Sequence, residues 1–216
     1  MWNETRERAA DTEVAQVCTR AASVWLESPL VGARDVLKAH VASTSTTFRL
    51  AERAFLDLVN LRGDASDPVF VAAVERVTGA HVPTRPNTVA PGRGCDVLWL
   101  GPDEWLVRSL QPQPAAFEVR LTQAFEGQFS NAVDVGSGYT VLEIGGTGVR
   151  EVLARGCPLD LHPHAFKQGQ CAQSVFFKAS IVLLPTASYT FDVVVRRSFA
   201  DYVCRIMLDA AAPLLS

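Results

Sequence analysis

Apolar residues along this chain recur at two spacings, one typical of strands and one typical of helices, and the two patterns alternate. The strand-like run 55–61 precedes a helix signal, in which Asp67 is a favourable N-cap and Pro68 a favourable first residue. Gly79 is a natural stop for this helix. Its apolar face consists of Phe70, Ala73, Val74 and Val77.

The next part of the pattern predicts a β-hairpin and a second helix. Strands at 97–100 and 105–107 flank a turn at 101–104, and Phe117, Leu121 and Phe125 then recur at helical spacing. The second half repeats this order, with strands near 132–135, 140–144, 174–184 and 190–196 and a helix after residue 148. A closing helix is expected to begin with the capping box 198–201. Its core face consists of Phe199, Tyr202, Val203, Ile206, Met207 and Ala210.

Corresponding elements of the two halves lie roughly 80 to 85 residues apart, which is about the size of one small α+β unit. We therefore predict an α+β fold of two duplicated, ferredoxin-like βαββα modules, residues 48–128 and 129–216. Residues 1–47 are expected to form an N-terminal arm, with a helical apolar period at 14–25 and a linker, outside the main core. This arm either packs on a partner or on the body of the protein, or is partly disordered.

Charge and cysteine usage narrow the class of protein. The formal net charge of −3 leaves no basic stripe for phosphates, so nucleic-acid binding is not expected. The first eight residues carry charges of both signs, unlike a signal peptide, and no apolar run approaches the roughly 20 residues that span a bilayer. Five irregularly spaced cysteines fit a reducing compartment. We expect a cytoplasmic protein that does not bind membranes.

The common catalytic motifs are absent. The glycine-rich turn 145–148 lacks the spacing of a dinucleotide-binding loop, no Walker loop is present, and Ser137 is flanked directly by glycines rather than set in a nucleophile elbow. Four carboxylates could act as general bases only in a pocket that perturbs them, and caps or turns are the simpler interpretation. These carboxylates are Asp134, Glu143, Asp160 and Asp192.

One short stretch offers a candidate metal site. Cys157, His162, His164 and Cys171 supply two thiolates and two imidazoles, a ligand set that tetrahedral zinc accepts. However, neither cysteine lies in a Cys-x-x-Cys knuckle, and an extended 162–164 segment would point the two rings apart. The spacing therefore favours a metal-free, turn-rich loop.

The hairpin suggests a docking surface. If Leu100 lies opposite Trp105, strand alternation places Leu98, Leu100, Trp105 and Val107 on one face, which is wholly apolar and predicted to be the core side. The other face is then an exposed patch that needs a partner. This predicted subunit interface consists of Val97, Trp99, Leu106 and Arg108.

Three motifs together resemble a known family. They are Leu-Trp-Leu-Gly-Pro-Asp-Glu-Trp-Leu at 98–106, Arg-Gly-Cys-Pro-Leu-Asp-Leu-His-Pro at 155–163, and Arg-Arg-Ser-Phe-Ala-Asp-Tyr at 196–202. With the shorter motifs at 28–30 and 60–63, the likeness covers nearly everything after the N-terminal arm. The chain resembles the gamma subunit of bacterial heterotetrameric sarcosine oxidase.

The resemblance implies a fold related to the folate-binding aminomethyltransferase of the glycine cleavage system. It also implies alpha, beta and delta subunits as partners, with FAD, FMN, NAD and tetrahydrofolate held by other chains. The assembled oxidase demethylates sarcosine to glycine, releases hydrogen peroxide, and yields formaldehyde or 5,10-methylenetetrahydrofolate. The gamma chain is implied to be non-catalytic, so we expect no catalytic and no cofactor-binding residues in this chain.

One departure from the aminomethyltransferases supports that expectation. Where those enzymes carry two glycines followed by an acidic pair, this chain has the run 179–184, Ala-Ser-Ile-Val-Leu-Leu. An apolar run cannot anchor a pterin or take a proton. A free-standing folate-binding aminomethyltransferase-like protein, and a gamma-like subunit of a related complex that oxidises another N-methyl amino acid, remain as alternatives.

Overall fold

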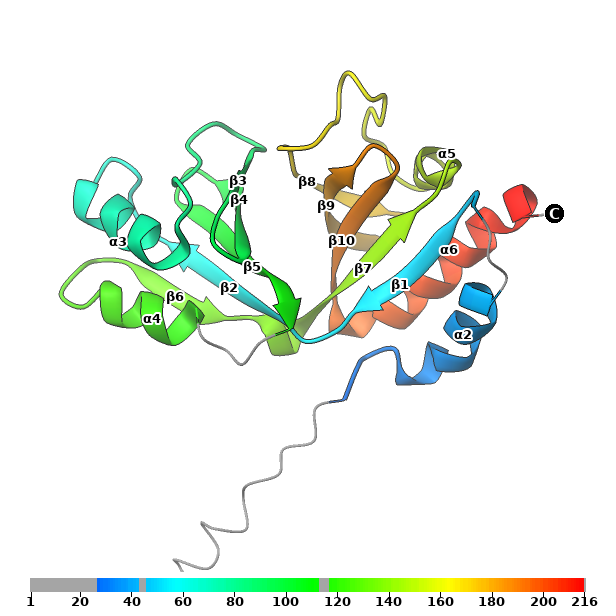
Figure 1. Ribbon diagram of the computed structural model, residues 1–216, viewed down its shortest axis with the longest axis horizontal. Coiled ribbons are helices and arrows are strands. Elements are labelled where there is room, and N and C mark those ends of the chain that lie inside the picture. Colours follow the sequence, from blue (N-terminus) through cyan, green and yellow to red (C-terminus); the bar gives the residue numbers. More distant parts are fainter. Residues whose placement is uncertain (1–26, 43–45, 113–116, 216) are drawn as a thin grey trace, which may run out of the picture.

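The computed structural model describes residues 27–42, 46–112 and 117–215. Two five-stranded antiparallel sheets lie side by side, and helices cover the outer face of each (Figure 1). The first sheet has the order β3-β4-β5-β2-β6, and the second has the order β1-β7-β10-β9-β8. Within the described ranges, no helix is both long and apolar enough to cross a membrane.

The first sheet and its helices occupy residues 56–134, which we call the first module. Its elements are β2 (Leu56–Arg62), α3 (Pro68–Thr78), β3 (Val89–Pro91), β4 (Cys95–Gly101), β5 (Glu104–Pro112), α4 (Phe117–Ala124) and β6 (Asn131–Asp134).

The second sheet and its helices draw on residues 28–53 and 139–215, which we call the second module. Its N-terminal elements are η1 (Val31–Ala33), α2 (Arg34–Ala42) and β1 (Arg49–Arg53). The short helix η2 (Gly136–Gly138) joins the modules. The remaining elements are β7 (Tyr139–Gly145), α5 (Val149–Ala154), β8 (Ala172–Phe176), β9 (Ala179–Ala187), β10 (Thr190–Arg196), η3 (Arg197–Phe199) and α6 (Ala200–Leu215).

The predicted duplication agrees with this element order. β2, α3, β4, β5 and α4 recur as β7, α5, β9, β10 and α6, and each set occupies the same positions in its own sheet. β2 begins at residue 56 and β7 at residue 139, while α4 begins at 117 and α6 at 200, so both pairs lie 83 residues apart.

The two sheets do not correspond to the predicted modules 48–128 and 129–216. β1 pairs with β7 and therefore belongs to the second sheet, whereas β6 pairs with β2 and belongs to the first. One strand of each sheet therefore comes from the other side of the predicted boundary between residues 128 and 129. Pairing between distant strands decides this, and a local apolar period carries no information about it.

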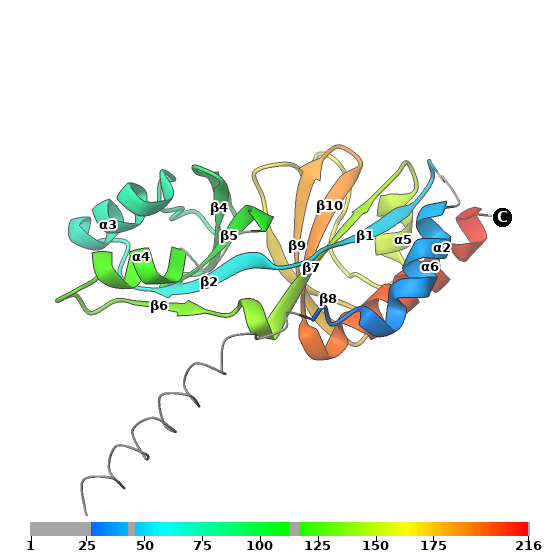
Figure 2. The ribbon, with the colours of Figure 1, turned by 60° about the horizontal axis from the view of Figure 1, so that its bottom comes forward.

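Part of the expected arm belongs to a core. Leu30 and Ala33 are buried in the core of the second module, and α2 lies beside β1 in both ribbon views (Figures 1 and 2). The predicted division placed residues 1–47 outside the main core, whereas residues 28–42 belong to the second module. The predicted helix at 14–25 lies outside the described residues.

Local helix signals succeed at α3 and fail at α6. Asp67 accepts a hydrogen bond from the Val69 N–H at 2.8 Å, and Gly79 adopts a left-handed φ of 72°, as predicted. At α6, Asp201 accepts instead from Arg205 Nε at 2.9 Å, so the predicted capping box is wrong. Phe199 is 40% exposed rather than in the core, because η3 precedes the α-helix and rotates that residue outward.

Three cores hold the fold together. One lies between the first sheet and α3 and α4, another between the second sheet and its helices, and a third between the inner faces of the two sheets. The third core fixes the modules relative to each other. It contains Leu56, Leu58, Leu98, Leu106, Val141, Cys171, Leu184 and Val194.

Candidate interaction surfaces and the junction between the modules

The β4–β5 hairpin does not face as the sequence predicted. Trp99 pairs with Trp105 and Leu98 pairs with Leu106, because a β-bulge at Leu100 shifts the register beside the turn. Val97, Trp105 and Val107 therefore point together into the helix-covered core, with Trp99 partly buried at its edge.

The opposite face of the hairpin is buried as well. Leu98 and Leu106 pack into the core between the sheets, and Arg108 is only 1% exposed. The predicted exposed patch of Val97, Trp99, Leu106 and Arg108 is thus wrong for three of its four members, which are buried within this chain. Contact of the partly exposed Trp99 with a partner stays a prediction.

The tip of the hairpin docks on the chain's own second module. The Cys171 thiol donates to the Trp99 carbonyl at 3.4 Å, and Gln173 Nε2 donates to the Leu100 carbonyl at 2.7 Å. Burial raises the pKa of the Cys171 thiol to about 12, so this thiol stays protonated at neutral pH and keeps its donor role. The hairpin is a junction within the protein.

A buried charge cluster lies at the same junction. Arg108 of β5 pairs with Asp192 of β10 through Nη1 and with Asp96 of β4 through Nη2, the latter at 2.6 Å. Arg53 of β1 also binds Asp192, at 2.7 Å, and donates to the Leu110 carbonyl at 2.5 Å. Asp192 is 0% exposed, so these cations are the groups that make its burial tolerable.

This cluster borders a cavity of about 370 Å³ between the modules. Apart from Asp96, Arg53 and Arg108, the walls come from residues 89, 91, 110, 168–169 and 184–186. Asp192 was one of the candidate general bases, but two guanidinium groups occupy its Oδ2. A carboxylate bound to two cations in this way supports the junction.

The other three candidate bases take no part in this cavity. Asp134 accepts from the Gly136 N–H at 2.7 Å and Asp160 from the His162 N–H at 2.9 Å, both as turn caps. Glu143 is a partly exposed residue of β7. The run 179–184 forms β9, where Ala179, Ile181 and Leu183 are buried on one face and Leu184 on the other.

The four candidate zinc ligands are not brought together. Cys157 contacts the Ser174 hydroxyl at 3.5 Å, whereas Cys171 lies against the hairpin. His162 and His164 stack with ring centroids 5.1 Å apart, so the expectation that the rings point apart is wrong. A turn at 163–165 causes this stacking. Among the residues that the structure describes, no three His, Cys, Asp or Glu side chains are grouped to hold a metal ion.

Arg150 of α5 anchors the 157–171 loop, a role that no sequence motif indicated. Its Nη1 donates to the Leu161 carbonyl, and its Nη2 approaches the Phe166 carbonyl at 3.4 Å and the Ser188 carbonyl at 3.5 Å. The guanidinium also stacks on the Phe191 ring at 4.8 Å. Burial lowers the pKa of Arg150, although the group stays charged.

We expect Arg150→Ala to loosen this loop without unfolding the protein. Amide hydrogen exchange of residues 157–171 is expected to speed up at least about tenfold, because the two loop carbonyls of Leu161 and Phe166 lose their donor together. Arg155→Ala is the matched control, since Arg155 makes only an exposed pair with Glu151 at 3.1 Å. Equal exchange in the two variants contradicts the anchoring role.

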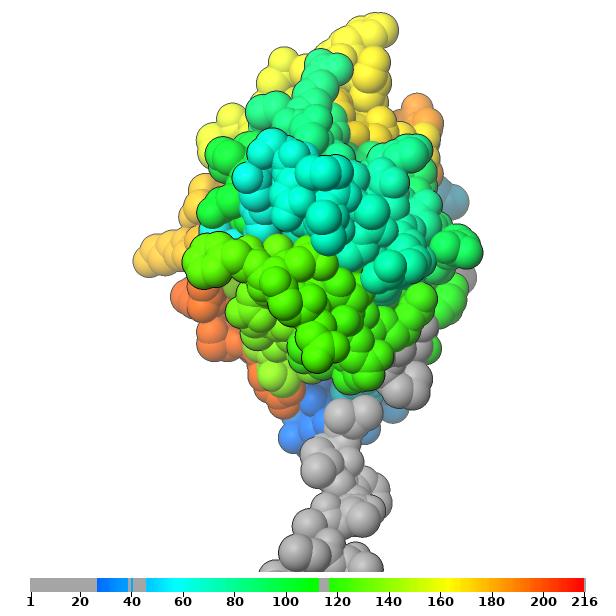
Figure 3. All heavy atoms as spheres, turned by 90° about the vertical axis from the view of Figure 1, so that its left-hand side faces the viewer, coloured from blue at the N-terminus to red at the C-terminus, as the bar shows by residue number. Residues whose placement is uncertain are grey.

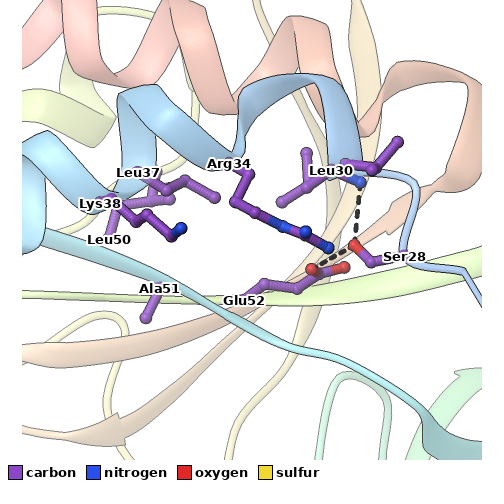
Figure 4. Close-up of a pocket in the computed structure, with 9 residues that line it drawn as sticks. Ser28, Leu30, Arg34, Leu37, Lys38, Leu50, Ala51 and Glu52 are labelled. Carbon is purple, nitrogen blue, oxygen red and sulfur yellow. Dashed lines mark hydrogen bonds between the residues drawn. The ribbon is translucent and has the colours of Figure 1, made fainter.

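Other hollows lie on the surface of the described residues. At the far end of the first module, a hollow of about 580 Å³ lies between the β2–α3 turn and the α4–β6 segment (Figure 3), and Phe129 beside it is fully exposed. In the second module, a groove of about 450 Å³ runs between α2 and β1 (Figure 4), and we call it the α2–β1 groove. Its lining residues are Ser28, Leu30, Val31, Arg34, Leu37, Lys38, Leu50, Ala51 and Glu52.

Comparison with known proteins identifies relatives over both modules. The family model for the sarcosine oxidase gamma subunit family matches residues 62–213. The sarcosine oxidase subunit gamma of Corynebacterium sp. strain P-1 is 31% identical over 175 residues, covering 81% of this chain and 85% of that protein. The subunit gamma of an Arthrobacter species is 30% identical over 178 residues, with the same coverage.

Solved structures give the same relationship. A chain of the heterotetrameric sarcosine oxidase from Corynebacterium sp. U-96 superposes with a TM-score of 0.80 at 26% identity, covering 88% of this chain and 97% of that one. Aminomethyltransferase T of the glycine cleavage system from Bartonella henselae superposes with a TM-score of 0.57 at 13% identity, covering 80% of this chain and 48% of that one. The latter likeness concerns the fold alone. The family match runs from the last residue of β2 into α6 and covers more than half of the chain, and the chain belongs to the sarcosine oxidase gamma subunit family.

Proposed function

We propose that this chain is the non-catalytic gamma subunit of a heterotetrameric sarcosine oxidase and helps to hold that assembly together. The observation that carries the proposal is the family match over residues 62–213, together with relatives that bear the name of this subunit. The oxidase converts sarcosine to glycine, and this chain contributes a docking scaffold rather than a reacting group.

The junction between the modules supports a scaffold role. A third apolar core and the cluster of Arg53, Arg108 and Asp192 fix the two sheets against each other. A subunit with one fixed arrangement presents its surfaces without the entropic cost of ordering two loose halves on binding. The buried carboxylate of Asp192 is bound to Arg53 and Arg108 through Oδ2, and this pairing gives it a structural role at the junction.

In this proposal the alpha, beta and delta subunits are the partners, and FAD, FMN, NAD and tetrahydrofolate are held by those chains. The assembly works in the cytoplasm. β9 carries no carboxylate, and it contains the run 179–184 where the resemblance implies the acidic pair of the aminomethyltransferases.

Co-expression with the other three subunits tests the proposal. A tag on this chain is expected to recover all four chains in equal amounts together with sarcosine-dependent hydrogen peroxide release. The chain expressed alone is expected to be colourless and inactive, because in this proposal the other subunits hold the flavins. A yellow, active single chain contradicts the proposal, as does failure of the four chains to co-purify.

Because the fold resembles that of aminomethyltransferase T, tetrahydrofolate binding by the isolated chain is also measured. A folate-binding aminomethyltransferase-like protein would bind tetrahydrofolate on its own, whereas a scaffold subunit leaves tetrahydrofolate free in equilibrium dialysis. The substrate range of the purified complex then separates sarcosine oxidase from an oxidase of another N-methyl amino acid.

A further inference from the structure

The α2–β1 groove combines an apolar floor with an open strand edge. Leu30 and Leu50 are buried at its base, and Leu37 is a partly buried residue of its wall (Figure 4). Val31 also lines the groove and is more exposed. β1 is the terminal strand of the second sheet and pairs with β7 alone among the described strands. Its outer edge therefore has backbone N–H and C=O groups that no described strand uses, and such an edge is a template for another strand.

The charges around the groove favour an acidic occupant. Arg34 and Lys38 of α2 line it, and neither forms an ion pair within the described part of the chain. The groove's carboxylate, Glu52, accepts hydrogen bonds from the hydroxyls of Ser28 and Thr140, the latter at 2.7 Å. Two cations and one carboxylate make this a positive site on a chain whose formal net charge is −3.

We infer that the α2–β1 groove receives an extended segment of a partner subunit that carries both apolar side chains and carboxylates. The segment adds a strand to the β1 edge, its apolar side chains fill the space over Leu37 and Leu50, and its carboxylates meet Arg34 and Lys38. This inference rests on the proposed function, because the partner is another chain of the oxidase.

Charge reversal tests the electrostatic part. The double variant Arg34→Glu/Lys38→Glu is expected to bind the other three subunits at least about tenfold more weakly at low salt. This loss is expected to shrink at high salt, where exposed charges are screened. Lys167→Glu/Lys178→Glu is the matched control, because it makes the same change in net charge at exposed lysines outside the groove. Equal weakening in both double variants overturns the inference.

Photo-crosslinking tests the identity of the occupant. Val31 lines the groove and is 45% exposed, so a benzophenone side chain at this position is tolerated and reaches the bound segment. In the purified complex, the crosslinked peptide is expected to come from a partner subunit and to contain Asp or Glu. A crosslink to residues 1–26 of this chain, a crosslink to a second copy, or no crosslink overturns the inference.

The two proposals fail in different ways. If the complex assembles normally and the groove variants have no effect, the groove inference is wrong and the subunit role stands. If the unaltered chain does not assemble with the other subunits, the proposed function is wrong and the groove inference falls with it. Thermal melts of each variant alone show whether the substitutions preserve the fold.

Discussion

Trp105→Ala is expected to lower the free energy of unfolding by about 3–5 kcal/mol, as for a buried large aromatic. Trp105 is 1% exposed, its ring lies 5.4 Å from Phe70, and its Nε1 donates to the Pro83 carbonyl at 2.7 Å. Truncation therefore leaves a cavity and also removes the donor for Pro83. Denaturant unfolding followed by circular dichroism measures the loss.

Two further substitutions separate the contributions. Trp105→Phe keeps most of the apolar volume, so it is expected to cost only about 1–2 kcal/mol, chiefly the lost hydrogen bond. Trp99→Ala is expected to cost less than Trp105→Ala, because Trp99 lies partly exposed at the edge of the same core. A larger loss for Trp99→Ala contradicts the observed facing of the hairpin.

Asp192→Ala is expected to destabilise the protein by about 3–5 kcal/mol, because it removes the buried carboxylate that Arg108 and Arg53 share. Arg108→Met/Asp192→Leu is expected to recover part of that loss, since it removes both fully buried charges and leaves only the less buried Arg53 and Asp96 without these partners. Thermal melts of the single and double variants measure the difference. A double variant that is no more stable than Asp192→Ala contradicts this account of the junction.

Local signals allowed much of the fold to be predicted. Asp67 and Gly79 bound α3 as expected, because a cap and a left-handed residue act within one turn of the helix. The order of elements and the duplication also followed from apolar spacing. The face of the hairpin on which Trp99 lies could not be predicted in this way. One bulged residue changes which residues of β4 and β5 lie opposite each other, although the alternation within each strand looks the same.

The buried charge cluster at the junction could not be predicted, for a different reason. Arg108 lies in an alternating strand pattern, where a charge normally indicates the solvent side. Its partner Asp192 is on another strand of another sheet, so no nearby residue reveals that the position is buried. Arg150 is a similar case, since its partners are backbone carbonyls, which every sequence contains. The α2–β1 groove depends on the pairing of β1 with β7, which the sequence also left undetermined.

The placement of β1 also sets the order in which the chain can fold during synthesis. The first module is encoded as one continuous stretch, so its sheet can close as soon as β6 has left the ribosome. The second module is split around it, and β1 must wait for β7 to be made before it finds a neighbour. Until then its apolar residue Leu50 and the adjoining Leu30 have no core to enter. The N-terminal part of the second module is therefore synthesised before the first module but can join its own sheet only after the first module has been made.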